Sequence, residues 1–280
     1  MHTLISSDAL AAHLADPGLI IFDASFYLPH ENRDPLALFH QKHIPGALFF
    51  DIDDVSDHQS SIPHMAPDPV TFERMIGDFG VSNSSTIVAY DQRGLFSAAR
   101  VWWLFRLFGH DRVQVLDGGL PKWLAEHRPI ESGHAPAKRE AHFTARLNPA
   151  FVRSIAQVKE NLDTQSEIVI DARSADRFSG AAPEPRPGVR SGHVPGARSL
   201  PFGELLNPDG TLKSSDALRT IFNAIGINET VAPVTMCGSG VTGTVVSLAL
   251  VHAGLPPGAL YDGSWAEWGG SPDTQVEKSV

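Results

Sequence analysis

VAPVTMCGSGVTG, residues 231–243, is the stretch of sequence that decides the fold. The apolar residues before Cys237 predict a short buried strand, and the run from Thr242 to Ala253 predicts a helix. A strand followed directly by a helix is the repeating unit of a parallel sheet covered by helices. Ligands bind beyond the carboxyl ends of the strands in such sheets, so we expect the chemistry in the loop that Cys237 opens.

Repeated motifs extend this pattern to the whole chain. The first copy of each lies in the N-terminal half, and the second follows about 150 residues later. The pairs are His43-Ile-Pro-Gly-Ala47 with His193-Val-Pro-Gly-Ala197, Ile21-Phe-Asp-Ala24 with Ile170-Asp-Ala172, and Asp117-Gly-Gly119 with Asp262-Gly-Ser264. A polar stretch without hydrophobic period separates the halves. We therefore predict two domains, residues 1–134 and 151–280, joined by a linker of residues 135–150.

Each half alternates short apolar runs with helical patterns. This alternation predicts an α/β fold in which each domain is a mostly parallel sheet with helices on both faces. The predicted strands are Leu19–Phe22, Ala47–Phe50, Thr86–Tyr90 and Val113–Leu116, then Ile168–Ile170, Ala197–Leu200, Val231–Met236 and Ala259–Tyr261. The predicted helices are Pro69–Phe79, Ala98–Phe108, Ala217–Ala224 and Thr242–Ala253.

Composition narrows the functional classes. The 280 residues carry 32 acidic and 22 basic side chains, and this excess of negative charge repels nucleic acids and anionic membranes, so neither is an expected partner. The single cysteine excludes an intramolecular disulfide and, within one chain, a metal site with several thiolates. No apolar run is long enough to span a membrane, and the N-terminus has no signal-peptide pattern. We therefore expect a reducing cytoplasm.

The position of Cys237 predicts a reactive thiol. Glycines in the loop let successive backbone N–H groups turn toward one point, and the following helix adds its positive N-terminal field. Such surroundings favour a thiolate over a thiol. The alternative is a small buried hydrophobic side chain, which is the usual place of an isolated cysteine.

The loop also matches a dinucleotide fingerprint. Gly238, Gly240 and Gly243 fit the pattern G-x-G-x-x-G, and Asp262 follows at a suitable distance. A dinucleotide-binding fold, however, places that turn at the start of a larger unit, and few residues follow it here. A serine nucleophile elbow is disfavoured as well, because it requires glycine at position 237.

The loop Cys237-Gly-Ser-Gly-Val-Thr242 resembles the active loop of 3-mercaptopyruvate sulfurtransferases, in the rhodanese superfamily of tandem α/β domains. The resemblance covers essentially the whole chain. It extends to Arg100-Val-Trp-Trp103, to Glu184-Pro-Arg-Pro-Gly188 and to Asp262-Gly-Ser-Trp-Ala-Glu-Trp-Gly269. In that family the N-terminal domain has lost its nucleophile, and Asp91 here stands where the second half has Cys237. The resemblance implies two tandem rhodanese-like domains, of which the second is catalytic.

The same resemblance implies a role for each residue of the site. Cys237 is the nucleophile, and Ser239, His64 and Asp53 form a proton relay, the last two coming from the first domain. Arg177 and Arg186 hold the substrate carboxylate, and the substrate-binding set also includes Gly238, Gly240, Val241 and Thr242. Asp171 and Arg173 form a structural ion pair, and His43 and His193 are interpreted as structural because both halves carry them. No metal or organic cofactor is implied.

The residues after Cys237 bear on the sulfur donor. Rhodaneses resemble one another in carrying arginine and lysine there, which suits the thiosulfate dianion, whereas Gly238 and Ser239 are neutral. The prediction is an enzyme that moves the sulfur of 3-mercaptopyruvate through a Cys237 persulfide to a small thiol, a thioredoxin-like dithiol or cyanide, and releases pyruvate. A thiosulfate sulfurtransferase and a persulfide-carrying module without fast turnover are the alternatives.

Overall fold

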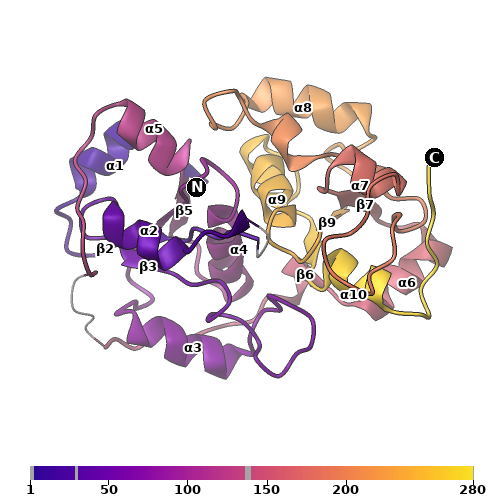
Figure 1. Cartoon of the computed structure of the whole chain (residues 1–280), viewed down its shortest axis with the longest axis horizontal. Coiled ribbons are helices and arrows are strands. Elements are labelled where there is room, and N and C mark those ends of the chain that lie inside the picture. The colour runs from indigo at the N-terminus through magenta and orange to yellow at the C-terminus, as the bar shows by residue number, and fades with distance from the viewer. Residues whose placement is uncertain (1–2, 29–30, 136–139, 280) are drawn as a thin grey trace. The chain divides into compact units, whose positions relative to one another are not determined.

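The computed structural model of the chain describes residues 3–28, 31–135 and 140–279, and it divides into two compact units (Figure 1). Residues 1–56, 67–147 and 207–212 form the first unit, and residues 57–66, 148–206 and 213–280 form the second. The main change of unit, between Leu147 and Asn148, falls within the stretch predicted as a linker, of which residues 136–139 lie outside the described residues. Residues 57–66 therefore belong to the second unit although the first half of the sequence encodes them.

The first unit contains a parallel sheet of five strands in the order β1-β5-β4-β2-β3. The strands are β1 (Leu4–Ile5), β2 (Leu19–Asp23), β3 (Leu48–Phe49), β4 (Thr86–Tyr90) and β5 (Val113–Leu116). The helices are α1 (Ser7–His13), α2 (Pro35–Gln41), α3 (Pro69–Asp78), α4 (Ala98–Leu107) and α5 (Gly119–Ala125), which flank the sheet (Figure 1).

The second unit repeats this architecture. Its five parallel strands have the order β6-β10-β9-β7-β8, which is the first order shifted by one repeat. The strands are β6 (Val152–Arg153), β7 (Ile168–Asp171), β8 (Arg198–Ser199), β9 (Pro233–Met236) and β10 (Ala259–Tyr261). The helices are α6 (Ile155–Thr164), α7 (Ala175–Ser179), α8 (Ser215–Ala224), α9 (Gly243–His252) and α10 (Ser264–Gly270), with short 3-10 turns at Pro149–Phe151 and Phe202–Leu205. The predicted α/β fold with two similar domains is confirmed.

The element that leads to Cys237 lies in the centre of the second sheet. All four residues of β9 are buried, and β9 is paired on both sides, with β10 and with β7. Helix α9 is buried from Gly243 to Leu250, as expected for a helix that is apolar all round. This strand and helix fix both ends of the intervening loop. Among the described residues, no helix is long and apolar enough to cross a membrane.

The two His-x-Pro-Gly-Ala turns are built alike. In the second unit the ring of His193 stacks on Phe178 with centroids 3.9 Å apart, and its Nδ1 lies 2.8 Å from the Phe178 carbonyl oxygen. Glu277 exchanges backbone hydrogen bonds with His193, and its carboxylate accepts the N–H of Gly196. The first unit repeats each of these contacts with His43, Phe39, Glu131 and Gly46. These contacts support the structural interpretation of both histidines.

Candidate active site

Cys237 follows the last residue of β9 and opens the loop that ends at α9. Its side chain is 2% exposed. Its backbone N–H donates to the Ser264 hydroxyl at 3.1 Å, and its carbonyl accepts the N–H of Trp265 at 3.0 Å. Gly240, with a φ of 76°, adopts the left-handed conformation that lets the loop curl back. Because burial alone is also typical of a structural cysteine, the chemistry must be judged from the neighbouring groups.

In the first unit, the matching loop binds the side chain of its first residue, Asp91, through backbone N–H groups. Asp91 follows β4 as Cys237 follows β9, and it is fully buried. Its carboxylate accepts hydrogen bonds from the backbone N–H groups of Arg93, Phe96, Ser97 and Ala98, at 2.8 to 3.0 Å. The loop and the start of α4 thus form a nest of N–H groups around one negative charge.

The second unit has the same connection at Cys237. Both loops close in the same way, since the carbonyl of Asp91 accepts the N–H of Leu120 and the carbonyl of Cys237 accepts the N–H of Trp265. Counting from the opening residue, the positions that match Arg93 and Phe96 are Ser239 and Thr242. By analogy with the Asp91 loop, the Cys237 loop is a candidate nest for a negative charge on the cysteine sulfur.

Ser239 and His64 are in direct contact. The hydroxyl of Ser239 lies 2.9 Å from His64 Nδ1, and both side chains are buried, at 5% and 6% exposed. His64 has a φ of 63°, which is uncommon for a residue other than glycine and is a feature of functional sites. Its segment is fixed by a hydrogen bond from the Ala66 N–H to the Asp262 carboxylate at 2.7 Å. Two residues of the predicted relay, 175 positions apart in the sequence, are thus neighbours.

Asp53, the third residue of the predicted relay, lies in the first unit, in the turn that follows β3. Its backbone N–H donates to the Asp51 carboxylate, and its carbonyl accepts the Ser56 hydroxyl. His64 was predicted to come from the first domain as well, but its segment is part of the second unit. The role of Asp53 beside His64 stays a prediction.

Arg177 approaches the Cys237 loop. A Cβ placed on Gly238 would lie 3.2 Å from Arg177 Nη2 and 3.9 Å from Nη1, so the end of the guanidinium packs closely against the loop. The guanidinium also binds Glu184, with Nε to Oε1 at 3.2 Å and Nη2 to Oε2 at 2.6 Å. Arg186 lies two residues beyond Glu184 on the same proline-rich loop and is partly buried.

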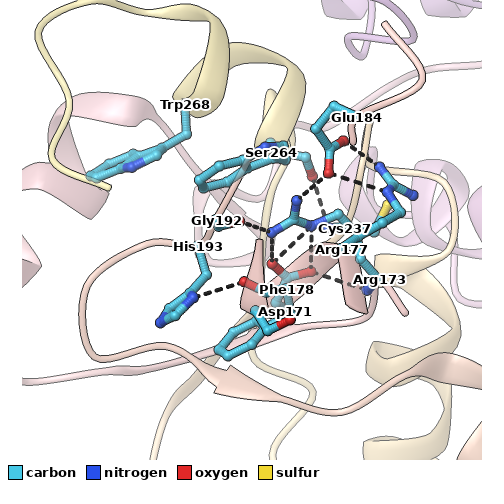
Figure 2. Close-up of polar contacts among 12 residues, drawn as sticks. Asp171, Arg173, Arg177, Phe178, Glu184, Gly192, His193, Cys237, Ser264 and Trp268 are labelled. Carbon is cyan, nitrogen blue, oxygen red and sulfur yellow. Dashed lines mark hydrogen bonds and ion pairs between the residues drawn. The ribbon is translucent and has the colours of Figure 1, made fainter. Parts of the chain in front are cut away.

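A buried ion pair lies behind Arg177. Arg173 binds the Asp171 carboxylate through Nε and Nη2, at 2.6 to 3.1 Å, and donates from Nη1 to Glu184 at 2.7 Å (Figure 2). Its guanidinium also stacks over the Trp265 ring at 4.3 Å from the centroid. Both partners are completely buried. These contacts agree with the structural ion pair that the resemblance implied for Asp171 and Arg173.

Sequence reasoning missed two residues of this site. Glu184 lies in a segment that carried the resemblance, but its place between two arginines depends on the fold. Ser264, fully buried with a φ of 51°, holds the backbone of Cys237. The internal repeat contained a signal for Ser264, because glycine, the usual residue for such a φ, stands at the matching Gly119.

Known proteins match the chain along most of its length. The rhodanese-like domain family matches residues 6–126 and 154–271. The 3-mercaptopyruvate sulfurtransferase of Rattus norvegicus is 44% identical over 94% of this chain and 89% of its own length. The thiosulfate/3-mercaptopyruvate sulfurtransferase 1 of Arabidopsis thaliana, named as mitochondrial, is 40% identical over 98% of this chain and 78% of its own.

A solved structure supports the same assignment. The crystal structure of SseA from Escherichia coli, described as a 3-mercaptopyruvate sulfotransferase with a rhodanese fold, superposes with a TM-score of 0.86. The two sequences are 39% identical, and the match covers 95% of this chain and 99% of SseA. The family model, the relatives and the solved structure agree with one another. The chain therefore belongs to the rhodanese family and is a sulfurtransferase with two rhodanese-like domains.

Proposed function

We propose that this enzyme takes sulfur from 3-mercaptopyruvate, holds it as a persulfide on Cys237, and passes it to a thiol, a thioredoxin-like dithiol or cyanide. The observation that carries the proposal is the contact at 2.9 Å between Ser239, on the loop that Cys237 opens, and His64, which supports a role of the two side chains in proton transfer. A relative named for 3-mercaptopyruvate, 44% identical to this chain, supports this donor.

The proposed chemistry balances without a cofactor. The Cys237 thiolate attacks the thiol sulfur of the substrate, an S–S bond forms, and the C–S bond breaks with its electron pair left on carbon. The resulting enolate of pyruvate gains one proton, and the transferred sulfur loses the proton of the substrate thiol. A hydroxyl in contact with an imidazole can carry a proton in both directions, which is the role that we assign to Ser239 and His64.

We assign the substrate carboxylate to Arg177 and Arg186. A guanidinium can hold a carboxylate through two parallel hydrogen bonds, and the guanidinium of Arg177 lies beside Gly238 of the Cys237 loop. The persulfide that remains is anionic, and backbone N–H groups of the loop from Gly238 to Thr242 would stabilise it, as the matching loop stabilises the Asp91 carboxylate.

Thiosulfate is the second candidate donor, because one relative carries both donors in its name. The neutral residues Gly238 and Ser239 offer a dianion no cationic side chain of their own. If the loop sets the donor, replacing these residues by arginine and lysine will raise the use of thiosulfate. Unchanged thiosulfate activity in that double variant would show that the donor is selected elsewhere.

The deciding experiment measures pyruvate release from 3-mercaptopyruvate with a thiol acceptor, beside thiocyanate formation from thiosulfate and cyanide. Both assays use the wild type and Cys237→Ser, which keeps the size of the side chain. Preference for 3-mercaptopyruvate, lost in the variant together with the persulfide mass of the protein, supports the proposal. Preference for thiosulfate contradicts the donor, and activity that survives without Cys237 contradicts the nucleophile.

The compartment and the acceptor are also proposals. A reducing cytoplasm would keep the single thiol active between turnovers, although one relative is named as mitochondrial. Sulfide release with thioredoxin, measured beside thiocyanate release with cyanide, would rank the acceptors.

A further inference from the structure

Each unit of the fold includes one short segment that the other half of the chain encodes. Residues 57–66 belong to the second unit, and residues 207–212 belong to the first. The two segments match within the repeat, because each begins at the same distance after one of the matching strands β3 and β8. The duplication therefore allows the two segments to be compared position by position.

Both segments are closed by the same backbone hydrogen bond. In the second unit the N–H of Asp57 donates to the carbonyl of Met65 at 2.8 Å. In the first unit the N–H of Asn207 donates to the carbonyl of Thr211, also at 2.8 Å. Each segment is thus a closed loop, and the residue that follows the accepting carbonyl is at its end.

An aspartate binds the end of each segment. The N–H of Ala66 donates to the Asp262 carboxylate at 2.7 Å, and the N–H of Leu212 donates to the Asp117 carboxylate at 2.8 Å. Each aspartate is the first residue after the last strand of its sheet in chain order, β10 or β5. Asp262 is 2% exposed. The repeat thus contains one carboxylate in each unit that holds the segment from the other half of the chain.

His64 occupies the left-handed position of its segment. It comes directly before Met65, as Gly210 comes directly before Thr211, and the two residues have φ values of 63° and 80°. Glycine adopts this conformation without strain, whereas a residue with a Cβ does not. A strained backbone persists only where its surroundings hold it in place. The segment with the histidine therefore depends more on the bonds that fix it than the segment with the glycine does.

The residue at this position meets the loop that follows the central strand of each sheet. In the first unit, a Cβ placed on Gly210 would lie 3.4 Å from the Cα of Gly94, in the loop after β4. In the second unit, His64 Nδ1 lies 2.9 Å from the Ser239 hydroxyl and 3.3 Å from the Ser239 carbonyl oxygen, in the loop after β9. The same segment thus brings a glycine to one loop and an imidazole to the other.

We propose that Asp262 is a positioning residue for proton transfer. Its carboxylate holds the N–H of Ala66, and this bond fixes the backbone two residues after His64. A charged acceptor makes a stronger hydrogen bond than a neutral one, which suits it to hold a strained segment. The imidazole is thereby kept against the hydroxyl of Ser239. The inference rests on the proposed function, since it concerns the proton transfer that we assign to these two side chains.

Asp262→Ala removes the acceptor. A misplaced acid–base group loses much of its effect, so we expect kcat for pyruvate release from 3-mercaptopyruvate to fall about tenfold, while KM changes less than about twofold. Asp117→Ala is the matched control, because it removes the same kind of bond at the matching position of the first unit. We expect the control to lose stability and to keep the wild-type kcat per folded molecule.

The His64→Asn background tests whether Asp262 acts through the imidazole. Since the imidazole is absent there, Asp262→Ala should not lower kcat any further. An equal fractional loss of kcat with and without His64 would show that Asp262 supports the site in another way, and overturns the inference.

Asp262→Asn covers the case in which the alanine variant fails to fold. It keeps one acceptor oxygen but removes the charge, so we expect kcat to fall about threefold in the presence of His64 and not at all in His64→Asn. A loss of equal size in both backgrounds again overturns the inference.

The same measurements separate this inference from the proposed function. A wild type that releases no Cys237-dependent pyruvate overturns the proposed function. A wild-type kcat in His64→Asn overturns the role of the histidine, and with it that of Asp262. An active wild type whose kcat is unchanged in folded Asp262→Ala overturns only the role of Asp262.

Discussion

Ser264 accepts a hydrogen bond from the backbone N–H of Cys237 at 3.1 Å and donates one to the carbonyl of Tyr261 at 2.9 Å. It makes these contacts from a φ of 51°, a conformation that costs a residue with a Cβ of the order of 1 kcal/mol. The matching residue of the first unit is Gly119, with a φ of 55° and no room for a Cβ. Of these two matching residues, only Ser264, in the unit that contains Cys237, combines a left-handed backbone with a hydroxyl group.

Ser264→Gly removes the hydroxyl without leaving a strained backbone, so it tests the contribution of the hydroxyl alone. The glycine relieves the strained φ, so we expect the free energy of unfolding to change little, whereas the Cys237 N–H loses its partner. We expect kcat for sulfur transfer to fall about fivefold, which corresponds to one neutral hydrogen bond of ~1 kcal/mol. Ser264→Ala keeps the strain and should lose stability as well. Wild-type kcat in the glycine variant would contradict a role of Ser264 in positioning Cys237.

His64→Asn tests the relay while it preserves the backbone. Asparagine tolerates the left-handed φ of 63° better than alanine does, so we expect this variant to fold and His64→Ala to be less stable. Loss of the imidazole should lower kcat with 3-mercaptopyruvate roughly 10²-fold, the usual contribution of a general acid–base group. Ser239→Ala removes the other half of the contact, and the double variant should be no worse than either single one. Additive losses would mean that the two side chains act separately.

Asp23, a buried aspartate of the first unit, should make the stability of this unit depend on pH. Burial raises the pKa of Asp23 to about 6, although hydrogen bonds from Ser25 and Gln92 partly oppose the shift. In the second unit Arg173 takes the place of Ser25 and pairs with Asp171.

The folded first unit binds the Asp23 proton more tightly than the unfolded chain does, so its stability falls as pH rises between the ordinary value of 3.8 and about 6. Asp23→Asn should remove this slope and gain at most about 3 kcal/mol above it, since one pKa unit corresponds to ~1.4 kcal/mol. Asp171→Asn should instead lose about 3 kcal/mol or more, because it leaves Arg173 buried without its main partner. Urea denaturation of each variant on both sides of the window measures these effects, and a steeper slope in Asp23→Asn would contradict the assignment.

Replacing His193 should affect stability and leave catalysis intact. His193→Ala removes the stacking on Phe178 and a buried hydrogen bond, so we expect the free energy of unfolding to fall by roughly 1 to 3 kcal/mol. His43→Ala should do the same to the first unit, because it makes the matching contacts with Phe39. Rates per folded molecule, measured well below the melting temperature, should equal those of the wild type. A loss of kcat in folded His193→Ala would show that this turn contributes to catalysis.

The sequence determined the elements whose signal is local. Three strands have the predicted bounds: Thr86–Tyr90, Val113–Leu116 and Ala259–Tyr261. Helix α4 differs from its prediction only in ending one residue earlier. These elements could be predicted because hydrophobic runs and periods are properties of neighbouring residues. Strands β1 and β6, two residues each, were not predicted, since so short a segment has no period and is formed by pairing with β5 and β10.

The sequence by itself also determined the duplication, the single cysteine at position 237 and the neutral residues after it, because repeats, composition and residue type need no coordinates. Only the tertiary structure decided that His64 touches Ser239, that residues 57–66 belong to the second unit, and that Ser264 holds the backbone of Cys237. It also decided that Glu184 binds Arg177 and that the guanidinium of Arg177 packs closely against Gly238. The physical reason is that local propensity is a property of neighbouring residues, whereas a site is formed by distant residues that meet only when the sheet and its loops have packed.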